Sequence, residues 1–267
     1  LLRHVAGLHP STSGGHGPPM KLHLVSCEVF YREMCRLIAS SPHQVDVSFL
    51  PKGLHDLPSE AMRTRVQEAV DRASADGDAV LMGYGLCNNG LHHLEARGVP
   101  LVLPRAHDCI TLFFGSRERY SDYFWSHPGT YFKTSGWIER GEASGDLRQL
   151  SIGHLAGLDL TYDQMVEQYG EDNAAYLMET LGRGENHYGN ITFIEMGVEP
   201  DNRFELSARA TAKEKGWSFE KQKGDLTLLA RLVNGDWNES DFLVVQPGHR
   251  VTARYDEGII ASEPVPA

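Results

Sequence analysis

The sequence predicts an α/β protein built on a Rossmann-like parallel sheet that is flanked by helices. Short apolar runs alternate with segments whose apolar residues recur at helical spacing, and this alternation favours parallel strands joined by right-handed crossovers. Apolar residues make up 41% of the chain and charged residues 23%, which is typical of a globular protein with a buried core. Both halves repeat the order of strand, glycine-containing turn and helix. Two lobes with a cleft at the carboxyl ends of the strands and one large sheet therefore both fit.

The first half of the chain supplies four of the expected strands. Each is a short apolar run bounded by turn residues, and they are expected at 21–27, 45–50, 78–85 and 99–106. Helical spacing predicts helices at 28–39, 58–73, 91–95 and 110–127. The last of these is unusually aromatic, and a turn and an extended stretch are expected to follow it at 128–138.

The second half begins after a segment rich in Gly and Ser, 141–157, which we interpret as a connection between lobes. Helices are expected at 162–181, 204–216 and 226–235, and strands at 191–197 and 241–248. The predicted organisation is a disordered leader or extension at 1–19, a lobe carrying a cysteine site at 20–140, the connection, and a second α/β lobe at 158–267.

Charge and cysteine content exclude several classes of protein. The chain has 25 Lys and Arg against 36 Asp and Glu, a formal net charge of −11, whereas proteins that bind nucleic acid cluster positive charge. No apolar run approaches the roughly 20 residues of a membrane helix. The first nineteen residues lack the apolar core of a signal peptide, and four cysteines are too few for a disulfide scaffold. We therefore expect a cytoplasmic protein that binds neither nucleic acid nor membrane.

Three of the four cysteines lie at the ends of predicted strands. Cys27 ends the first strand, Cys87 follows the third and Cys109 follows the fourth. Ligands of open parallel sheets bind where the carboxyl ends of the strands meet, so three sulfur atoms can converge there on zinc or on an iron–sulfur cluster. Independent packing of small apolar thiols is the alternative. Cys35 lies in the middle of a predicted helix, and we assign it to the core.

The sequence HDC at 107–109 adds a histidine to this set, because His107 and Cys109 share one side of an extended backbone. The predicted metal ligands are therefore Cys27, Cys87, Cys109 and His107, although a surface loop histidine is an equally good interpretation of His107. Other polar residues lie near the same strand ends. Glu28 and Asp108 are candidate catalytic residues, and the candidate cofactor-binding residues are Tyr84, Arg105 and Glu195. The segment GYGLCNNG is not a dinucleotide fingerprint, and it favours a tight turn that presents Cys87.

Four blocks of sequence resemble one protein family. They are VSCEVFYRE (25–33), GYGLCNNG (83–90), PRAHDCITLFFGSRERY (104–120) and PGTYFKTSGW (128–137), and together they are similar to the domain of unknown function sixteen thirty-eight. The resemblance brings no settled activity. It implies that this protein is encoded beside corrinoid-dependent methyltransferases and corrinoid proteins, as members of the family often are. The motif residues of the family correspond here to Cys27, Glu28, Cys87, Arg105, His107, Asp108 and Cys109.

These observations leave three hypotheses open. The first is an enzyme that uses cysteine- and histidine-bound zinc to activate a thiol or another methyl acceptor in corrinoid-linked one-carbon metabolism. Its partners would be a small-molecule substrate and a corrinoid protein or methyltransferase that brings the corrinoid. The second is an iron–sulfur protein whose three cysteines hold a four-iron, four-sulfur cluster with one open iron. The third is an accessory protein that carries a corrinoid or a metal without catalysing a reaction.

Overall fold

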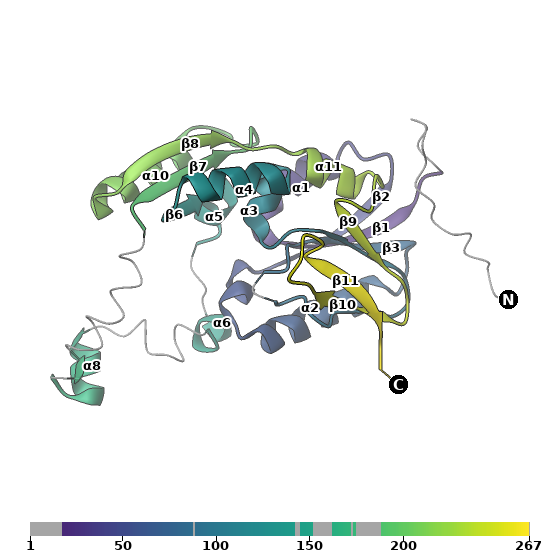
Figure 1. Cartoon of the computed structure of the whole chain (residues 1–267), viewed down its shortest axis with the longest axis horizontal. Coiled ribbons are helices and arrows are strands. Elements are labelled where there is room, and N and C mark those ends of the chain that lie inside the picture. The colour runs from purple at the N-terminus through teal and green to yellow at the C-terminus, as the bar shows by residue number, and fades with distance from the viewer. Residues whose placement is uncertain are drawn as a thin grey trace.

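The centre of the fold is a five-stranded sheet with the strand order β2-β1-β3-β5-β9. The structure is a computed structural model and describes residues 18–87, 89–141, 145–151, 162–171, 173–174 and 188–266. The five strands are β1 (Lys21–Cys27), β2 (Gln44–Leu50), β3 (Ala79–Gly83), β5 (Leu101–Pro104) and β9 (Phe242–Val245). The first four pair in parallel, and β9 runs antiparallel to β5. The predicted α/β fold with a mainly parallel sheet is confirmed (Figure 1).

Hydrophobicity explains the order of the strands. The central strands β3 and β5 are buried at every residue, and β1 is buried over most of its length. Strands covered on both faces need continuous apolar runs, which AVLMG and LVLP provide. In contrast, β2 has no buried residue and lies at the edge.

Helices cover both faces of this sheet (Figure 1). On one face α2 (Ser59–Ala73) packs against β1 through an apolar stripe that includes Met62, Val66 and Val70. On the other face α1 (Tyr31–Ile38) packs against α11 (Thr227–Val233), which also contacts β3 and β5. A short 3-10 helix, η1 (Glu28–Phe30), leads from β1 into α1. The cysteine that ends β1 is thus followed at once by helix.

A second parallel sheet of three strands has the order β6-β7-β8. It contains β6 (Thr130–Lys133), β7 (Asn190–Glu195) and β8 (Ser218–Lys223), with α10 (Arg203–Lys215) packed against β7 and β8. Ile191, Phe193 and Phe204 lie in the small core between them. Ile194 and Met196 belong instead to the large core of the first sheet, so the two sheets share apolar packing.

A third, antiparallel sheet is made from the end of the chain, where the sequence shows no clear pattern. Strands β10 (His249–Ala253) and β11 (Ile260–Pro264) pair with each other, and β10 also pairs with the two-residue strand β4 (Glu95–Ala96). The helix predicted at 91–95 is therefore wrong. The N–H of His93 donates to the carbonyl of Val251 at 2.7 Å, and its positive φ of 67° is incompatible with a helix. A partner far along the chain decides the local conformation.

The long helix predicted at 110–127 is two helices. Gly115 ends α3 (Cys109–Phe114) in the left-handed conformation with a φ of 78°, and the Ser116 hydroxyl then accepts a bond from the N–H of Arg119 to begin α4 (Arg117–Ser126). The extended stretch expected next corresponds to β6, and α5 (Ser135–Glu139) follows it. Cys35 also differs from the prediction, because it is exposed on α1.

The strand pairs do not follow the order of the predicted lobes. In the sequence, the segment 141–157 separates β6 from β7 and β5 from β9. In the structure, however, β6 pairs with β7 and β5 pairs with β9, so strands from the two predicted lobes lie in the same sheets. Within it, α6 (Gly145–Gln149) is described, whereas 142–144 and 152–157 lie outside the described residues. Helix α8 (Tyr162–Tyr169) begins the helix expected at 162–181, most of whose remainder lies outside them, as does the leader at 1–17. The division into lobes stays a prediction.

Within the described ranges, no helix has both the length and the apolar character that crossing a bilayer requires.

Candidate functional site

Cysteines gather at the carboxyl end of the central sheet. Cys27 is the last residue of β1, Cys87 lies four residues after β3, and Cys109 begins α3 five residues after β5. Because these strands are parallel neighbours, their carboxyl ends open onto one edge of the sheet. All three thiols are buried.

The backbone of the GYGLCNNG segment holds Cys87 against the segment that precedes Cys109. The N–H of Leu86 donates to the carbonyl of Ala106 at 2.8 Å, and the N–H of Cys87 donates to the carbonyl of His107 at 2.9 Å. A Cβ at Gly85 would lie 2.6 to 2.8 Å from backbone atoms of Asp108, so only glycine permits this approach. Cys87 itself has a positive φ of 48°. The strained turn thus directs one thiol toward the other.

Asp108 fixes the position of Cys109. Its Oδ1 accepts bonds from the N–H groups of Ile110 and Thr111 at 3.0 and 3.1 Å, which makes it the N-cap of α3. Its Oδ2 accepts a bond from the Tyr120 hydroxyl at 3.0 Å. A carboxylate with both oxygens bonded in this way positions the helix that begins with Cys109.

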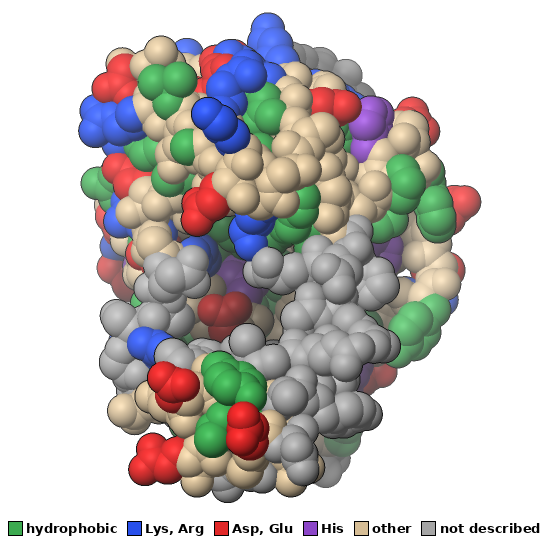
Figure 2. All heavy atoms as spheres, turned by 90° about the vertical axis from the view of Figure 1, so that its left-hand side faces the viewer, with side chains coloured by type: hydrophobic (Ala, Val, Ile, Leu, Met, Phe, Trp, Pro, Cys, Tyr) green, Lys and Arg blue, Asp and Glu red, His purple; other side chains and the backbone are tan. Residues whose placement is uncertain are grey.

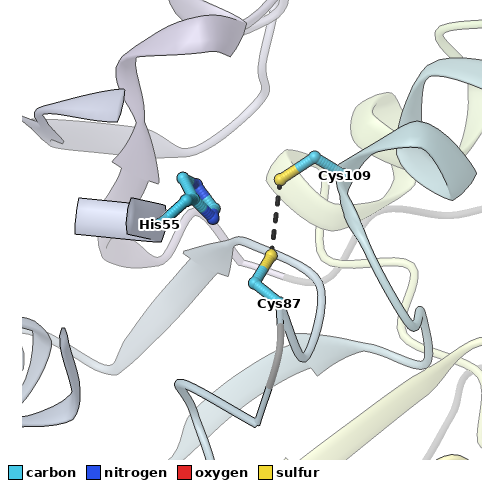
Figure 3. Close-up of side chains that lie close together, drawn as sticks. All are labelled: His55, Cys87 and Cys109. Atoms are coloured by element: carbon cyan, nitrogen blue, oxygen red, sulfur yellow. Dashed lines mark hydrogen bonds between the residues drawn. The ribbon is translucent and has the colours of Figure 1, made fainter. Parts of the chain in front are cut away.

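Two sulfur atoms and one imidazole form a group with the ligand types of a metal site (Figure 3). The Sγ atoms of Cys87 and Cys109 lie 3.6 Å apart. His55, from the 3-10 helix η2 (Lys52–Asp56) that follows β2, offers a ring nitrogen, and the ligand atoms of all three residues lie within 4.8 Å of one another. His55 Nε2 is also 3.3 Å from the Sγ of Cys27. Three cysteines and one histidine therefore meet at this edge.

The electrostatics of the group follow from burial and from mutual contact. The hydrogen bond with Cys87 and then burial raise the pKa of the Cys109 thiol well above its usual range. Burial likewise raises the pKa of Cys27, although the hydrogen bond with His55 opposes this. Burial alone would lower the pKa of His55, but the bond with Cys27 and the charges of Cys109 and Cys27 raise it to about 9. The pKa shifts of Cys27 and Cys109 thus both favour the protonated thiol.

Tyr84 adds an unpaired polar atom beside the cysteines. Its side chain is fully buried, and its ring centroid lies 5.8 Å from that of His55. Among the described residues the Tyr84 hydroxyl has no hydrogen-bond partner. Burial, together with the nearby Cys27, Cys109 and Cys87, raises its pKa well above the ordinary value, so it carries a proton. An unpaired buried hydroxyl costs about 1–3 kcal/mol, and a ligand bound at this place would give it an acceptor.

The donor set fits a single tetrahedral Zn²⁺. Two thiolates that bind one zinc ion at about 2.3 Å lie about 3.8 Å apart, close to the 3.6 Å between Cys87 and Cys109. Sulfur and imidazole nitrogen are the ligands that zinc prefers. In a four-iron, four-sulfur cluster each cysteine binds a different iron atom, which requires the sulfur atoms of the cysteines to lie farther apart. The pair Cys87 and Cys109 therefore fits one metal ion better than a cluster.

His55 also lines a cavity of about 240 Å³. Its other described lining residues are Lys52, Asp56, Tyr131, Lys133, Trp137, Ile138 and Gly141. The face of the molecule in Figure 2 is hollowed near its centre, with histidine and acidic side chains set back below Lys and Arg side chains. The imidazole is thus shared between the cysteine group and a space large enough for a small molecule.

Among the described residues, His107, Arg105 and Glu195 are not part of the group formed by His55, Cys87 and Cys109. His107 is exposed and contributes its backbone carbonyl rather than its ring to the turn. The guanidinium of Arg105 donates to the carbonyls of Glu239, Gly258 and Ile260 and so holds the end of the chain. Glu195 forms an ion pair with Lys221 at 2.7 Å on the second sheet. The roles predicted for these residues stay predictions.

Glu28 lies at the junction between β1, η2 and the residue that follows α5. Its Oε1 accepts the backbone N–H of Lys52 at 2.8 Å, and its Oε2 lies 4.0 Å from Arg140. The carboxylate thereby holds the start of η2, the helix that presents His55. The structure thus gives Glu28 a positioning contact, while its proposed chemistry stays a prediction.

His55 is the residue that the sequence reasoning missed. The rule that selected the cysteines also applies to the second strand, whose carboxyl end is followed five residues later by His55 in PKGLHDL. No motif marks this histidine, since its partners lie 28, 32 and 54 residues away in the sequence. A search for ligand residues after every parallel strand would have found it.

A comparison with known protein families covers three of the four sequence blocks, those at 83–90, 104–120 and 128–137. The family described as "Protein of unknown function (DUF1638)" matches residues 49–233. A search of curated proteins found no match, and neither did a search of solved structures. The matched segment holds His55, Cys87 and Cys109 and covers more than half of the chain. The chain belongs to the DUF1638 family.

Proposed function

We propose that this protein is a zinc enzyme that activates a small thiol as a methyl acceptor, with Cys87, Cys109 and His55 as the metal ligands. The observation that supports the proposal most directly is the convergence of these three ligand atoms within 4.8 Å at the carboxyl edge of the sheet. The resemblance to a family whose members are often encoded beside corrinoid-dependent methyltransferases suggests the donor, a methyl corrinoid on a partner protein.

An incomplete ligand set favours catalysis over a structural role. Structural zinc sites close with four protein ligands, whereas catalytic sites keep one position for substrate or water. The described residues supply three ligand atoms in the group, with Cys27 held 3.3 Å from His55. Zinc would lower the pKa of a bound substrate thiol, so that the sulfur is a thiolate at neutral pH.

The chain's own residues bind and orient the reactants. Asp108 and the turn at Cys87 fix the two sulfur ligands, while Glu28 holds the helix that carries His55. The Tyr84 hydroxyl, which has no partner among the described residues, donates a hydrogen bond to the group that enters. A methyl corrinoid on the partner would supply the methyl group: the substrate thiol would release its proton to water, the sulfur–carbon bond would form, and the cobalt would keep the electron pair of the broken cobalt–carbon bond.

The test is elemental analysis together with a visible spectrum, on protein purified without oxygen. About one zinc per chain and no colour are expected. Cys87→Ser and Cys109→Ser should each lose the metal while the circular dichroism stays unchanged, and His55→Ala should lower the zinc affinity. Cys35→Ser is the matched control, because Cys35 is exposed, and it should keep one zinc per chain.

Other outcomes point to the alternative functions. Iron with labile sulfide and a brown colour would contradict the zinc site and favour a cluster that includes Cys27. Full metal content in Cys87→Ser or in Cys109→Ser would show that the two thiols do not share a site. With zinc present, Glu28→Gln should reduce turnover of a methyl corrinoid and a thiol. An accessory protein would bind both ligands without turnover, and its binding would not change in this variant.

A further inference from the structure

Lysines outnumber carboxylates among the described residues that line the cavity beside His55, although the protein as a whole is acidic. The whole chain has a formal net charge of −11, yet the described lining of the cavity includes two lysines, Lys52 and Lys133, against one carboxylate, Asp56. A surface of this overall sign repels anions. Positive charge concentrated in one hollow therefore indicates a site of its own.

Three elements build this cavity through their local geometry. In the 3-10 helix η2, Lys52 and His55 are three residues apart, a spacing that places side chains on one face. In β6, Tyr131 and Lys133 alternate with Phe132. Tyr131 and Lys133 line the cavity, whereas Phe132 packs against the large core. The 3-10 helix η2 thus forms one side of the cavity and the strand β6 forms another.

Trp137 forms an apolar wall next to the imidazole. It lies in α5, whose first turn is fixed by a bond from the Trp137 N–H to the Thr134 hydroxyl at 3.2 Å. Its ring centroid lies 6.3 Å from that of His55. Lys133 is held nearby, with its Nζ 3.4 Å from the Thr211 hydroxyl. A ligand here would meet cationic groups, an aromatic surface and the histidine of the cysteine group.

We propose that this cavity binds the anionic group of a small molecule, such as a carboxylate, sulfonate or phosphate, through Lys52 and Lys133. That the molecule is the thiol substrate, with its sulfur directed to the metal, rests on the proposed function. The volume of about 240 Å³ lies below the roughly 300–1,000 Å³ of pockets for drug-sized ligands. A cavity of this size suits a short anionic molecule rather than a nucleotide.

The first experiment compares two thiols of equal length on the cobalt-substituted protein. Mercaptoacetate carries a carboxylate where 2-mercaptoethanol carries a neutral hydroxymethyl group, and binding of either is followed by the ligand-field absorption of Co²⁺. Mercaptoacetate should bind at least about tenfold more tightly, because its carboxylate accepts charge-assisted hydrogen bonds from the lysines. In the double variant Lys52→Gln, Lys133→Gln the two affinities should become equal within about twofold, while the metal content stays at one ion per chain.

The matched control is Lys213→Gln, which changes an exposed lysine on α10 that is not among the described residues lining the cavity. It should keep the full preference for mercaptoacetate. Equal binding of both thiols to the unchanged protein, or a preference that survives in the double variant, would overturn the proposal. In either case the zinc content would still stand as a separate result.

A second experiment tests the cavity without any metal. Acetate is titrated into the Cys87→Ser variant, and the indole N–H of Trp137 is followed by nuclear magnetic resonance after assignment with Trp137→Phe. A saturable shift that disappears in Lys52→Gln, Lys133→Gln supports the anion site even if no metal binds. Absence of a saturable shift in this arm contradicts it, whatever the metal analysis shows.

Discussion

Tyr84 and Tyr123 show how differently a structure can treat two buried hydroxyl groups. The Tyr84 hydroxyl has no partner among the described residues, although the side chain is fully buried beside the cysteines. The Tyr123 hydroxyl lies 2.7 Å from the Thr192 hydroxyl and donates to Glu220 Oε2, also at 2.7 Å. An unpaired buried hydroxyl lowers the stability of a protein. A ligand that accepts a hydrogen bond from the Tyr84 hydroxyl would explain why a tyrosine rather than a phenylalanine occupies this position.

The first prediction compares these two tyrosines in the metal-free protein. Tyr84→Phe should raise the free energy of unfolding by about 1 kcal/mol, because it removes an unpaired polar atom. Tyr123→Phe should lower it by about 1–3 kcal/mol, since Thr192 and Glu220 lose a partner. Urea denaturation of both variants measures the difference. Destabilisation by Tyr84→Phe would show that this hydroxyl is already satisfied in the metal-free state.

Glu33 is a second polar residue without a partner. Both of its carboxyl oxygens are buried and lack a hydrogen bond among the described residues, and the side chain is fully buried. Burial, assisted by the charges of Glu199 and Glu139 against that of Arg32, raises the pKa of Glu33 from 4.5 to about 7. Between about pH 4.5 and 7, Glu33 is therefore protonated in the folded protein and ionised in the unfolded chain.

The second prediction is a loss of stability with rising pH. Since the folded pKa exceeds the unfolded pKa, the free energy of unfolding should fall between about pH 4.5 and 7 and then level off, by up to about 3 kcal/mol. Glu33→Gln should remove most of this dependence, whereas Glu214→Gln, on the exposed surface, should leave it intact. Urea denaturation at pH 5 and pH 8 measures both. An equal pH dependence in Glu33→Gln and in the unchanged protein would contradict the assignment.

At the scale of elements, the close contact between α5 and η1 shapes one wall of the site. A Cβ at Gly136 would lie 1.7 Å from the carbonyl oxygen of Val29, an atom of the backbone that has little freedom to move. Arg32 on α1 reinforces the contact through two bonds to the carboxylate of Glu139, at 2.8 and 2.7 Å. Helix α5 also carries Trp137, which lines the cavity. The contact between α5 and η1 therefore positions one wall of the proposed ligand site.

The third prediction tests that contact. Gly136→Ala should destabilise the protein by about 1–3 kcal/mol, because the added methyl group forces η1 and α5 apart. Gly189→Ala is the matched control, since a Cβ there meets no described atom within 4 Å, and it should change the stability by less than about 0.5 kcal/mol. Thermal unfolding of the two variants is the measurement. Equal melting temperatures would mean that the two helices separate without cost.

At the scale of the whole molecule, the segment that matches the family is smaller than the folding unit. The match begins at residue 49 and ends at 233, yet β1 lies between β2 and β3 in the middle of the sheet, and β9 pairs with β5 at its edge. Neither β1 nor β9 falls within the matched residues. The site needs β1 as well, because Cys27 at its end contacts His55.

The fourth prediction follows from this topology. A fragment of residues 49–233 should not fold, because it lacks β1, β9 and all but the last two residues of β2, and with them a large part of the core. A fragment of residues 18–266 should fold cooperatively. Circular dichroism and amide dispersion in nuclear magnetic resonance spectra distinguish the two. Cooperative unfolding of the shorter fragment would show that β1, most of β2 and β9 are all dispensable for folding.

The sequence by itself determined the central sheet and most of the cysteine site. Apolar runs identify β1, β3 and β5, because buried parallel strands have a hydrophobic pattern that is local in the chain. The position of each cysteine after a strand then predicts one shared edge, and the structure places Cys87 and Cys109 there with their sulfur atoms 3.6 Å apart.

Only the tertiary structure decided which histidine joins the cysteines and how the end of the chain pairs. His55 reaches the group because β2 pairs with β1, whereas His107, two residues from Cys109, is exposed. Residues 91–96 form a turn and the strand β4 because β10 binds them from more than 150 residues away. Hydrogen bonds between segments that are distant in the sequence produce no local periodicity. Ligand groups that come together from separate loops likewise produce no local motif, so neither can be predicted from sequence patterns alone.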